Sequence, residues 1–179
     1  MGEREEPRAT ERADDGRPVA VLTCGPAGAG KTTYAQGLER QGYVRLSHDV
    51  EVRRRFGRYG VDIPADRFEE YNDAVRPLVK ERLAELLHQG RDVVVDLSFW
   101  RKADRDTYKA IVEAAGGRWR LVYLDVPHDV LRRRLLARRA RDDADAFPVP
   151  DELLARFLAG FEVPRGEGEE VVVVGEDAP

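Results

Sequence analysis

One short segment limits the possible folds of this chain more than any other feature. Residues 25–33 read GPAGAGKTT, which fits the pattern G-x-x-x-x-G-K-[ST] without a mismatch. The apolar run VAVLT at residues 19–23 precedes this segment, and a helical pattern at residues 31–40 follows it. A strand, a glycine-rich turn and a helix in this order predict a phosphate-binding loop inside an α/β domain.

The residues of this loop have distinct expected roles in holding a nucleoside triphosphate. The glycines let successive backbone N–H groups point inward, and the following helix adds the positive end of its dipole. Lys31 can reach the β- and γ-phosphates, and the Thr32 hydroxyl can ligate a bridging Mg²⁺ ion. The expected nucleotide site comprises Gly25, Ala27, Gly28, Ala29, Gly30, Lys31, Thr32 and Thr33.

Short apolar runs alternate with helical patterns along the remaining chain. Strands are expected at residues 19–23, 43–46, 93–95, 121–125 and 171–174. Helices are expected at residues 31–40, 66–90, 103–115, 129–141 and 151–161, with a kink or a division into two helices at Pro77. Continuous apolar strands between helices predict a parallel sheet covered by helices on both faces, which is a three-layer α/β fold.

Composition fits one folded domain between two charged tails. The chain has 179 residues, of which 42% are hydrophobic, and we expect tails at residues 1–17 and 176–179 around a domain at 18–175. Its single cysteine, Cys24, is interpreted as a packed strand-end residue. The lone thiol, the lack of an apolar membrane span and the lack of a secretory signal favour the cytoplasm. The net charge of −4 gives no global basic field, although a local basic groove stays open.

Two aspartates follow predicted strands and are candidates for catalysis. Asp49 follows the strand at 43–46, and Asp96 follows VVV at 93–95. Ligands of parallel sheets bind beyond the carboxyl ends of the strands, so both carboxylates should face the phosphate loop. We assign Asp49 as the general base for an attacking hydroxyl, and Asp96 as a group that orients the acceptor or holds a water on Mg²⁺. The alternative for each is a helix N-cap, and His48 is expected at the surface or behind the site.

An arginine-rich helix is the third candidate element. Residues 129–141 read DVLRRRLLARRAR, in which Arg134 and Arg138 share a face because they are four residues apart. Such a face can close over the triphosphate and stabilise charge in the transition state. A solvated basic face is the alternative. Residues 141–150 are expected to form the hinged part of a lid.

The ordered segments GPAGAGKTT, LSHD, VVVDLSFWRKADR, DVPHDVLRRRLLARR and FEVP resemble the small P-loop kinases of the AAA-33 or zeta-toxin-like group. They are also similar to the kinase domain of polynucleotide 5′-hydroxyl kinases. The resemblance implies ATP as the nucleotide and a nucleoside-kinase-like fold with strand order 2-3-1-4-5. It implies roles for Asp49 as base, Asp96, Arg105 as an acceptor-side arginine, and the lid arginines Arg134 and Arg138. One departure is Val52, which stands where the family often has arginine, so Arg53 becomes the candidate for that substrate contact.

Three functions remain open from the sequence. The leading one is a kinase that transfers the γ-phosphate of ATP to a hydroxyl of a small molecule, such as a metabolite or an antibiotic. The second is a polynucleotide 5′-hydroxyl kinase, which the basic cluster Arg53, Arg54, Arg55 and Arg58 could serve. The third is an ATP-binding switch that hydrolyses ATP slowly. A hydroxyl-bearing partner molecule is expected without a membrane, and the oligomeric state is left open.

Overall fold

The computed structural model describes residues 15–139, 155 and 158–174, except for the side chains of Ala65 and of residues 136–139. Most of the two expected tails, the expected lid loop at 141–150 and most of the expected helix at 151–161 lie outside the described residues. No helix in the described parts of the chain combines the length and the apolar composition that a bilayer crossing needs.

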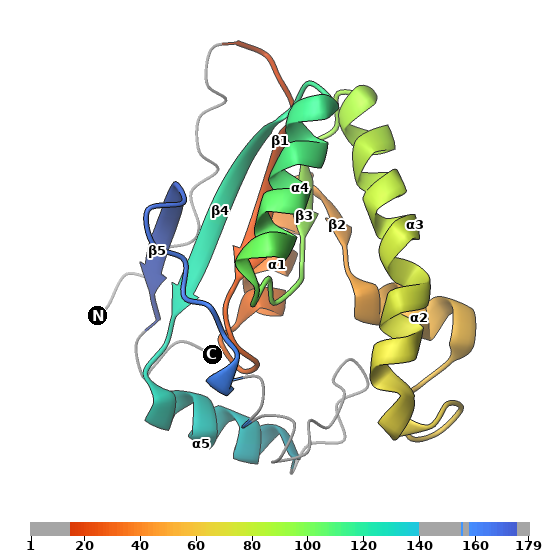
Figure 1. Cartoon of the computed structure of the whole chain (residues 1–179), viewed down its shortest axis with the longest axis vertical. Helices are drawn as coiled ribbons and strands as arrows, with labels where there is room; N and C mark the ends of the chain where they lie inside the picture. The colour runs from red at the N-terminus through yellow and green to blue at the C-terminus, as the bar shows by residue number, and fades with distance from the viewer. Residues whose placement is uncertain (1–14, 140–154, 156–157, 175–179) are drawn as a thin grey trace.

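The described strands form one parallel sheet in the order β2-β3-β1-β4-β5 (Figure 1). This arrangement confirms the predicted α/β fold and the strand order that the resemblance implied. Every residue of β1 is buried, because β1 has strands on both sides and helices on both faces. The strands span Val19–Cys24 (β1), Val44–Leu46 (β2), Val93–Val95 (β3), Arg118–Asp125 (β4) and Glu169–Val173 (β5).

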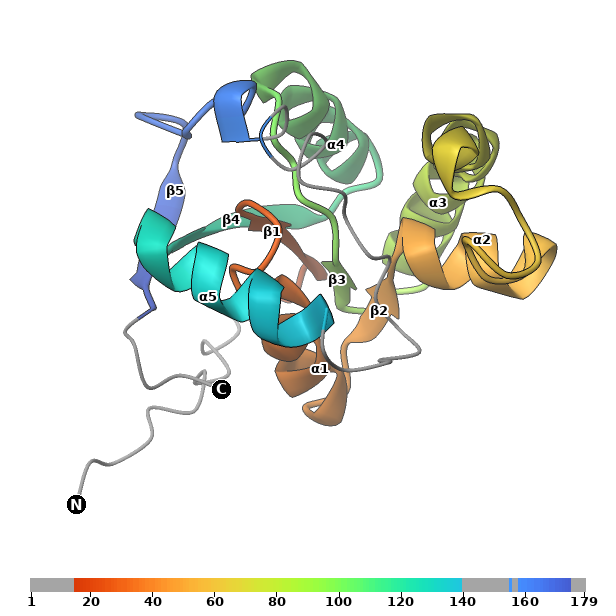
Figure 2. The same ribbon diagram turned by 90° about the horizontal axis from the view of Figure 1, so that it is seen from below.

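Helices cover the two faces of this sheet, so the domain has three layers (Figure 2). Alternate residues of the central strands point to opposite faces, as the period of two in a strand requires. Val21, Val94 and Val122 pack with α1 and α5, whereas Leu22, Val95 and Leu121 pack with α3 and α4. The helices span Lys31–Arg40 (α1), His48–Phe56 (α2), Phe68–His88 (α3), Lys102–Ala114 (α4) and His128–Arg139 (α5).

The expected division at Pro77 is wrong, because α3 runs through this residue as one helix of 21 residues. Proline removes one N–H donor from the helix and leaves the carbonyl four residues earlier without its partner. That carbonyl belongs to Asp73, and both Asp73 and Pro77 are exposed, so water can hydrate it. Hydration of this carbonyl therefore offsets part of the cost of the proline.

A second, smaller core lies between α2 and α3, away from the sheet. Its buried members are Val52, Ile63 and Val75, and the rings of Tyr59 and Tyr71 pack against them. The connection between the two helices contains a short 3-10 helix, Ala65–Arg67. The unit of α2 and α3 follows β2 directly, so it is attached at the edge of the sheet.

Candidate active site

The phosphate loop lies between the end of β1 and the start of α1, as the sequence predicts. Gly28 and Gly30 have φ values of 82° and 94°, a conformation that a residue with a side chain rarely adopts. Ala29 N donates to Pro26 O at 3.2 Å, which closes a tight turn within the loop. The loop thus forms a curled cup at the N-terminus of a ten-residue helix, a position that favours anions.

The side chain of Lys31 bends back over this cup. Its Nζ atom donates to Pro26 O at 2.9 Å, at the opposite rim of the loop. An ammonium group in this position can exchange the carbonyl for phosphate oxygens when a nucleotide enters. Thr32 and Thr33 follow in the first turn of α1, directly after the cup.

Helix α5 packs directly on the phosphate loop. A Cβ atom added at Gly28 would lie 3.2 Å from Leu135 Cγ and 3.6 Å from Leu131 O. Arg134 precedes Leu135 on α5 and is half-buried, and its role as a lid arginine remains a prediction. The backbone of Arg138 lies one turn further along α5, and its side chain is outside the described part of the chain.

Asp49 lies in the first turn of α2, which begins immediately after β2 and Ser47. Asp49 is exposed. Burial of Tyr59 and, as the second cause, the negative charge of Asp49 raise the pKa of Tyr59. Arg53 stands four residues later on the same side of α2 and is also exposed. The N-cap position belongs to Ser47, so Asp49 does not have the capping role that was its alternative.

The carboxyl ends of β1, β2, β3 and β4 meet at one edge of the sheet because these strands are parallel. Four segments start at these strand ends: the phosphate loop, α2 with Asp49, the loop after Asp96, and the connection to α5. Figure 2 looks at this edge and shows the turn from β1 to α1 between α5 on one side and α2 on the other. The fold therefore brings most of the predicted site residues to one edge.

Asp96 is paired with an arginine that the sequence analysis did not identify. Both Nε and Nη2 of Arg45 donate to Asp96 Oδ2, at 3.0 and 2.7 Å. The Asp96 side chain is 4% exposed, and its backbone N–H donates to Leu46 O at 2.8 Å. Its predicted roles toward Mg²⁺ and the acceptor remain predictions, and they would have to be performed by a carboxylate that Arg45 holds.

Arg105 does not occupy the acceptor-side position that the resemblance implied. Its side chain is 1% exposed and makes a two-pronged ion pair with Glu167, at 2.8 Å from Nε and 2.7 Å from Nη2. Nη1 donates to Phe99 O at 2.8 Å and to Glu162 O at 2.9 Å. With its donors used inside the protein, Arg105 is a buried anchor rather than a substrate contact.

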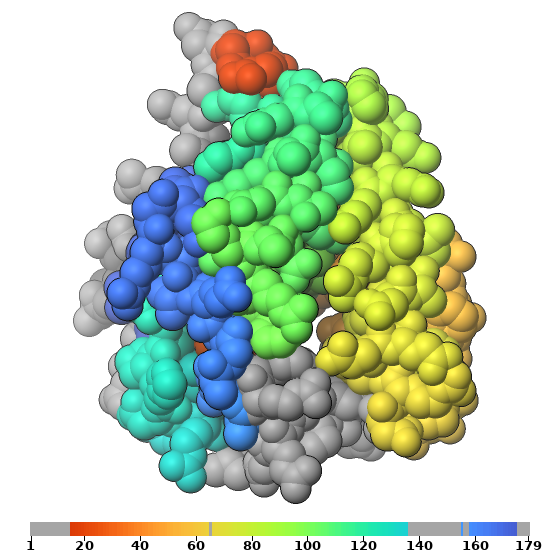
Figure 3. All heavy atoms as spheres, in the orientation of Figure 1, coloured from red at the N-terminus to blue at the C-terminus, as the bar shows by residue number. Residues whose placement is uncertain are grey.

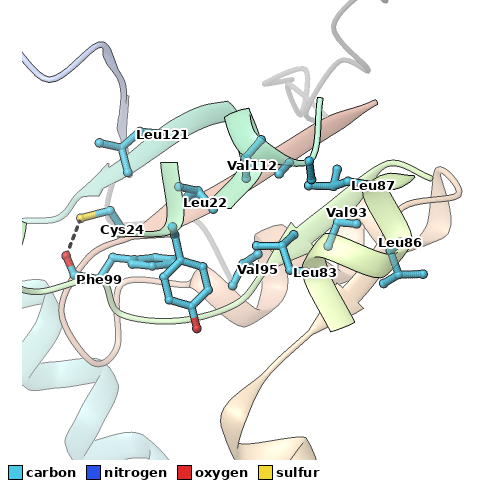
Figure 4. Close-up of a cluster of buried hydrophobic side chains, with 13 residues drawn as sticks. Leu22, Cys24, Leu83, Leu86, Leu87, Val93, Val95, Phe99, Val112 and Leu121 are labelled. Carbon is cyan, nitrogen blue, oxygen red and sulfur yellow. Dashed lines mark hydrogen bonds between the residues drawn. The ribbon is translucent and has the colours of Figure 1, made fainter. Parts of the chain in front are cut away.

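The loop between β3 and α4 has a strained residue at its centre. Phe99 has a φ of 46°, and it is the only described residue other than glycine with a positive φ. Such a conformation costs on the order of 1–3 kcal/mol for a bulky side chain. Figure 4 shows Phe99 among the core side chains, where its ring packs edge-on against Tyr108 with centroids 4.9 Å apart. Core packing thus helps to hold this backbone conformation.

Cys24 lies beneath this loop and is buried, as the sequence analysis expected. Its Sγ donates to Phe99 O at 3.5 Å, the contact drawn as a dashed line in Figure 4. Burial raises the pKa of the thiol to about 11. The thiolate is therefore scarce at neutral pH, and Cys24 is a packing residue and not a nucleophile.

Behind Asp49, a polar cluster joins α2 to α3 and α4. His48 Nε2 lies 3.4 Å from Tyr108 Oη, and the nearby charges of Arg76 and Lys80 lie on α3. Burial, followed by those two positive charges, lowers the pKa of His48 to about 4. His48 is therefore neutral at physiological pH and lies behind the site, one of the two positions that the sequence analysis allowed. Figure 3 shows the surface hollowed between the lower part of α3 and the beginning of α4.

The described residues contain no group of three His, Cys, Asp or Glu side chains that could hold a metal ion. Mg²⁺ usually keeps several waters and takes few protein ligands, so a nucleotide-bound Mg²⁺ ion would not require such a group. Thr32, in the first turn of α1 beside the cup, fits a single hydroxyl ligand of that kind.

Sequence reasoning missed the pairs Arg45–Asp96 and Arg105–Glu167. The second pair did leave a signal in α4, because Arg105 continues the buried stripe of Tyr108 and Val112 at helical spacing. A charged residue on a buried stripe requires an opposite charge nearby. The first pair left no comparable signal, since β2 has only three residues and none is fully buried.

Comparisons with known proteins agree with this geometry. A family model, AAA_33, described as an AAA domain, matches residues 21–164. A curated shikimate kinase from Thermobifida fusca (strain YX) is 44% identical over 79 residues, which are 44% of this chain and 44% of the relative. The chain thus matches less than half the length of that relative.

Solved structures share the fold at low sequence identity. A gluconokinase from Sinorhizobium meliloti 1021 superposes with a TM-score of 0.59 at 24% identity, covering 90% of this chain and 85% of the other. A chain of the Pnkp1/Rnl/Hen1 RNA repair complex superposes with a TM-score of 0.65 at 18% identity, covering 80% of this chain and 44% of the other. At these identities the likeness establishes the fold and leaves the reaction open.

Proposed function

This chain belongs to the AAA_33 family, and from that membership and the geometry of the site we propose that it is a kinase. It would transfer the γ-phosphate of ATP to a hydroxyl group of a small molecule. The observation that carries the proposal is the position of Asp49, a carboxylate at the same sheet edge as a complete phosphate cup. A protein that only binds nucleotide has no need of a general base at this edge of the sheet.

The proposed reaction assigns a separate task to each element at this edge. The acceptor oxygen attacks the γ-phosphorus, the bond from that phosphorus to the β–γ bridging oxygen breaks, and ADP leaves with the electron pair. Asp49 accepts the hydroxyl proton, a contribution of typically ~10²–10⁴-fold in rate. Lys31 and the cup amides would stabilise the charge on the phosphates, and Arg134 and Arg138 of α5 are assigned the role of lid arginines.

Mg²⁺ would be held by the Thr32 hydroxyl and the nucleotide phosphates, and it would neutralise charge on the β- and γ-oxygens. Asp96 would act from behind this position by holding a water. Its pairing with Arg45 fixes the direction of the carboxylate, which suits an orienting group.

A small-molecule acceptor is favoured over a polynucleotide because acidic side chains pair with three arginines of the basic cluster, Arg54, Arg55 and Arg58. Glu51 accepts hydrogen bonds from both Arg54 and Arg55, and Arg58 lies 3.8 Å from Asp62. A groove that tracks a nucleic-acid backbone requires positive charge that is available to phosphates. The curated relative named above is a shikimate kinase, a name that gives a small molecule as the acceptor of that protein, and this supports the preference.

A direct assay tests the proposal. The protein is mixed with Mg²⁺ and ATP and with a panel of sugar acids, cyclic polyols, hydroxylated antibiotics and 5′-hydroxyl oligonucleotides, and ADP release is followed. We expect at least one small acceptor to raise ADP release well above the rate in its absence. Turnover with oligonucleotides alone would support the polynucleotide 5′-kinase instead. A slow ATPase rate that no acceptor raises would support the nucleotide-dependent switch.

A further inference from the structure

The loop at residues 97–101, between β3 and α4, borders the active-site edge and is tied to the phosphate cup. Gly25 N, at the first position of the cup, donates to Ser98 O at 3.1 Å. The next carbonyl, that of Phe99, accepts a hydrogen bond from Arg105 Nη1 at 2.8 Å. Two successive carbonyls of this loop are therefore held by hydrogen bonds, one from the phosphate cup and one from α4.

The other end of the loop is held by a segment that lies some 60 residues further along the chain. Glu162 N donates to Trp100 O at 2.8 Å, and Glu162 Oε2 accepts from Lys102 N at 2.7 Å. Figure 3 shows the segment from residue 158 onward, in blue, lying against the beginning of α4. Backbone contacts of this kind fix a loop whatever its side chains are.

A buried ion pair joins the loop and this segment at their centre. Arg105 donates to Phe99 O and Glu162 O with one nitrogen, and to both oxygens of Glu167 with its two others. Glu167 is itself fixed, because Lys109 Nζ donates to its backbone carbonyl at 2.7 Å. Stability alone does not call for such a pair, since well-packed apolar residues often serve as well.

We propose that Arg105 and Glu167 are positioning residues, whose buried pair holds the loop at 97–101 in the conformation needed at the acceptor side of the site. The strained backbone of Phe99 supports this assignment, because such a conformation persists only where its surroundings impose it. The exposed Ser98 and the half-buried Trp100 flank Phe99, so their direction depends on it. The role toward the acceptor rests on the proposed kinase function.

Hydrogen exchange of the full chain tests the positioning without an acceptor. Arg105→Lys keeps the charge and loses the fork, and Glu162→Ala removes an exposed anchor of the same loop. Asp106→Asn is the control, since it breaks an exposed pair with Lys102 on the same helix. We expect both test variants to speed exchange in peptides covering 97–102 by at least ~10-fold, with residues 121–124 of β4 changed less than about twofold. The control should leave both regions unchanged.

Two outcomes would overturn the positioning. One is equal acceleration in the loop and in β4, which would mean a general loss of stability, and the other is no change in the loop. With an acceptor found in the ADP assay, the variants should raise its KM by at least ~5-fold and leave the KM of ATP within twofold. An unchanged acceptor KM would overturn the functional role. A panel without any acceptor would instead contradict the kinase proposal, and the exchange data would still decide whether the pair holds the loop.

Discussion

The nucleotide side and the acceptor side of the site rest on cores of different size. The phosphate cup follows β1, the fully buried central strand. Both large apolar clusters of the sheet contain residues of β1. Asp49 and Arg53 stand on α2, which follows the partly buried edge strand β2 and packs on three buried residues. In the proposed kinase, phosphate binding thus rests on the large core and acceptor recognition on the small one, where residues can change at lower cost to stability.

The largest expected effect concerns the nucleotide side. Lys31→Ala should lower kcat/KM for ATP by more than about 10³-fold, because the lysine contributes both to binding and to charge stabilisation in the transition state. ADP release and calorimetry with Mg·ATP measure the two contributions. Arg40→Ala, at the exposed far end of the same helix, should change neither. A Lys31→Ala protein with near-normal turnover would show that the cup is not the reaction centre.

A substitution of the proposed base on the acceptor side should lower turnover and leave ATP binding nearly unchanged. Asp49→Asn should leave ATP affinity within about twofold and lower kcat by about 10²-fold, since only the proton acceptor is lost. Glu51→Gln, two residues away in the same turn of α2, should leave kcat nearly intact because Glu51 pairs with Arg54 and Arg55. Normal kcat in Asp49→Asn would refute the assignment of the base.

The same truncation in each core measures how different the two cores are. Val21→Ala in the sheet and Val75→Ala in α3 each remove a fully buried side chain. We expect a loss of about 2–3 kcal/mol in unfolding free energy for Val21→Ala and about 1–2 kcal/mol for Val75→Ala. Denaturant titration gives these values, and hydrogen exchange should show the Val75→Ala effect confined to α2 and the first half of α3. Equal and global effects would mean that the two cores form one cooperative unit.

The smallest expected effect is a pH dependence of the acceptor side. Burial and the charges of Arg76 and Lys80 lower the pKa of His48 to about 4, against about 6.5 when the chain is unfolded. The folded form thus binds fewer protons at His48 than the unfolded form does. The His48 contribution to the unfolding free energy is therefore fully present above pH ~6.5 and declines as the pH falls toward 4. Between pH 6 and pH 5 the His48 contribution to the unfolding free energy should fall by about 1 kcal/mol.

The comparison of wild type with His48→Gln isolates this contribution, because the variant should show a shallower loss of stability over the same pH range. His88→Gln provides the control, since His88 is exposed at the far end of α3. Identical pH profiles for wild type and His48→Gln would show that His48 does not titrate as its surroundings imply.

The sequence predicted the features that depend on local chemistry. The phosphate loop is set by glycines and by the run Lys31–Thr32, and strands such as Val93–Val95 are set by continuous apolar residues, so both were predictable. The pairs of Arg45 with Asp96 and Arg105 with Glu167 connect residues 51 and 62 positions apart. No local pattern specifies such a contact, and the resemblance to a family misassigned Arg105 because a motif gives a residue type without its direction.

The buried state of Cys24 allows a dye to be attached selectively at another position of the chain. The sequence contains a single cysteine, and Cys24 lies buried with its thiol pKa raised to about 11. The native chain should therefore react slowly with maleimide dyes while it is folded. A cysteine introduced on exposed α2 or at the start of α4 would take up the dye selectively, and the rate at which Cys24 becomes labelled would report how often the sheet opens.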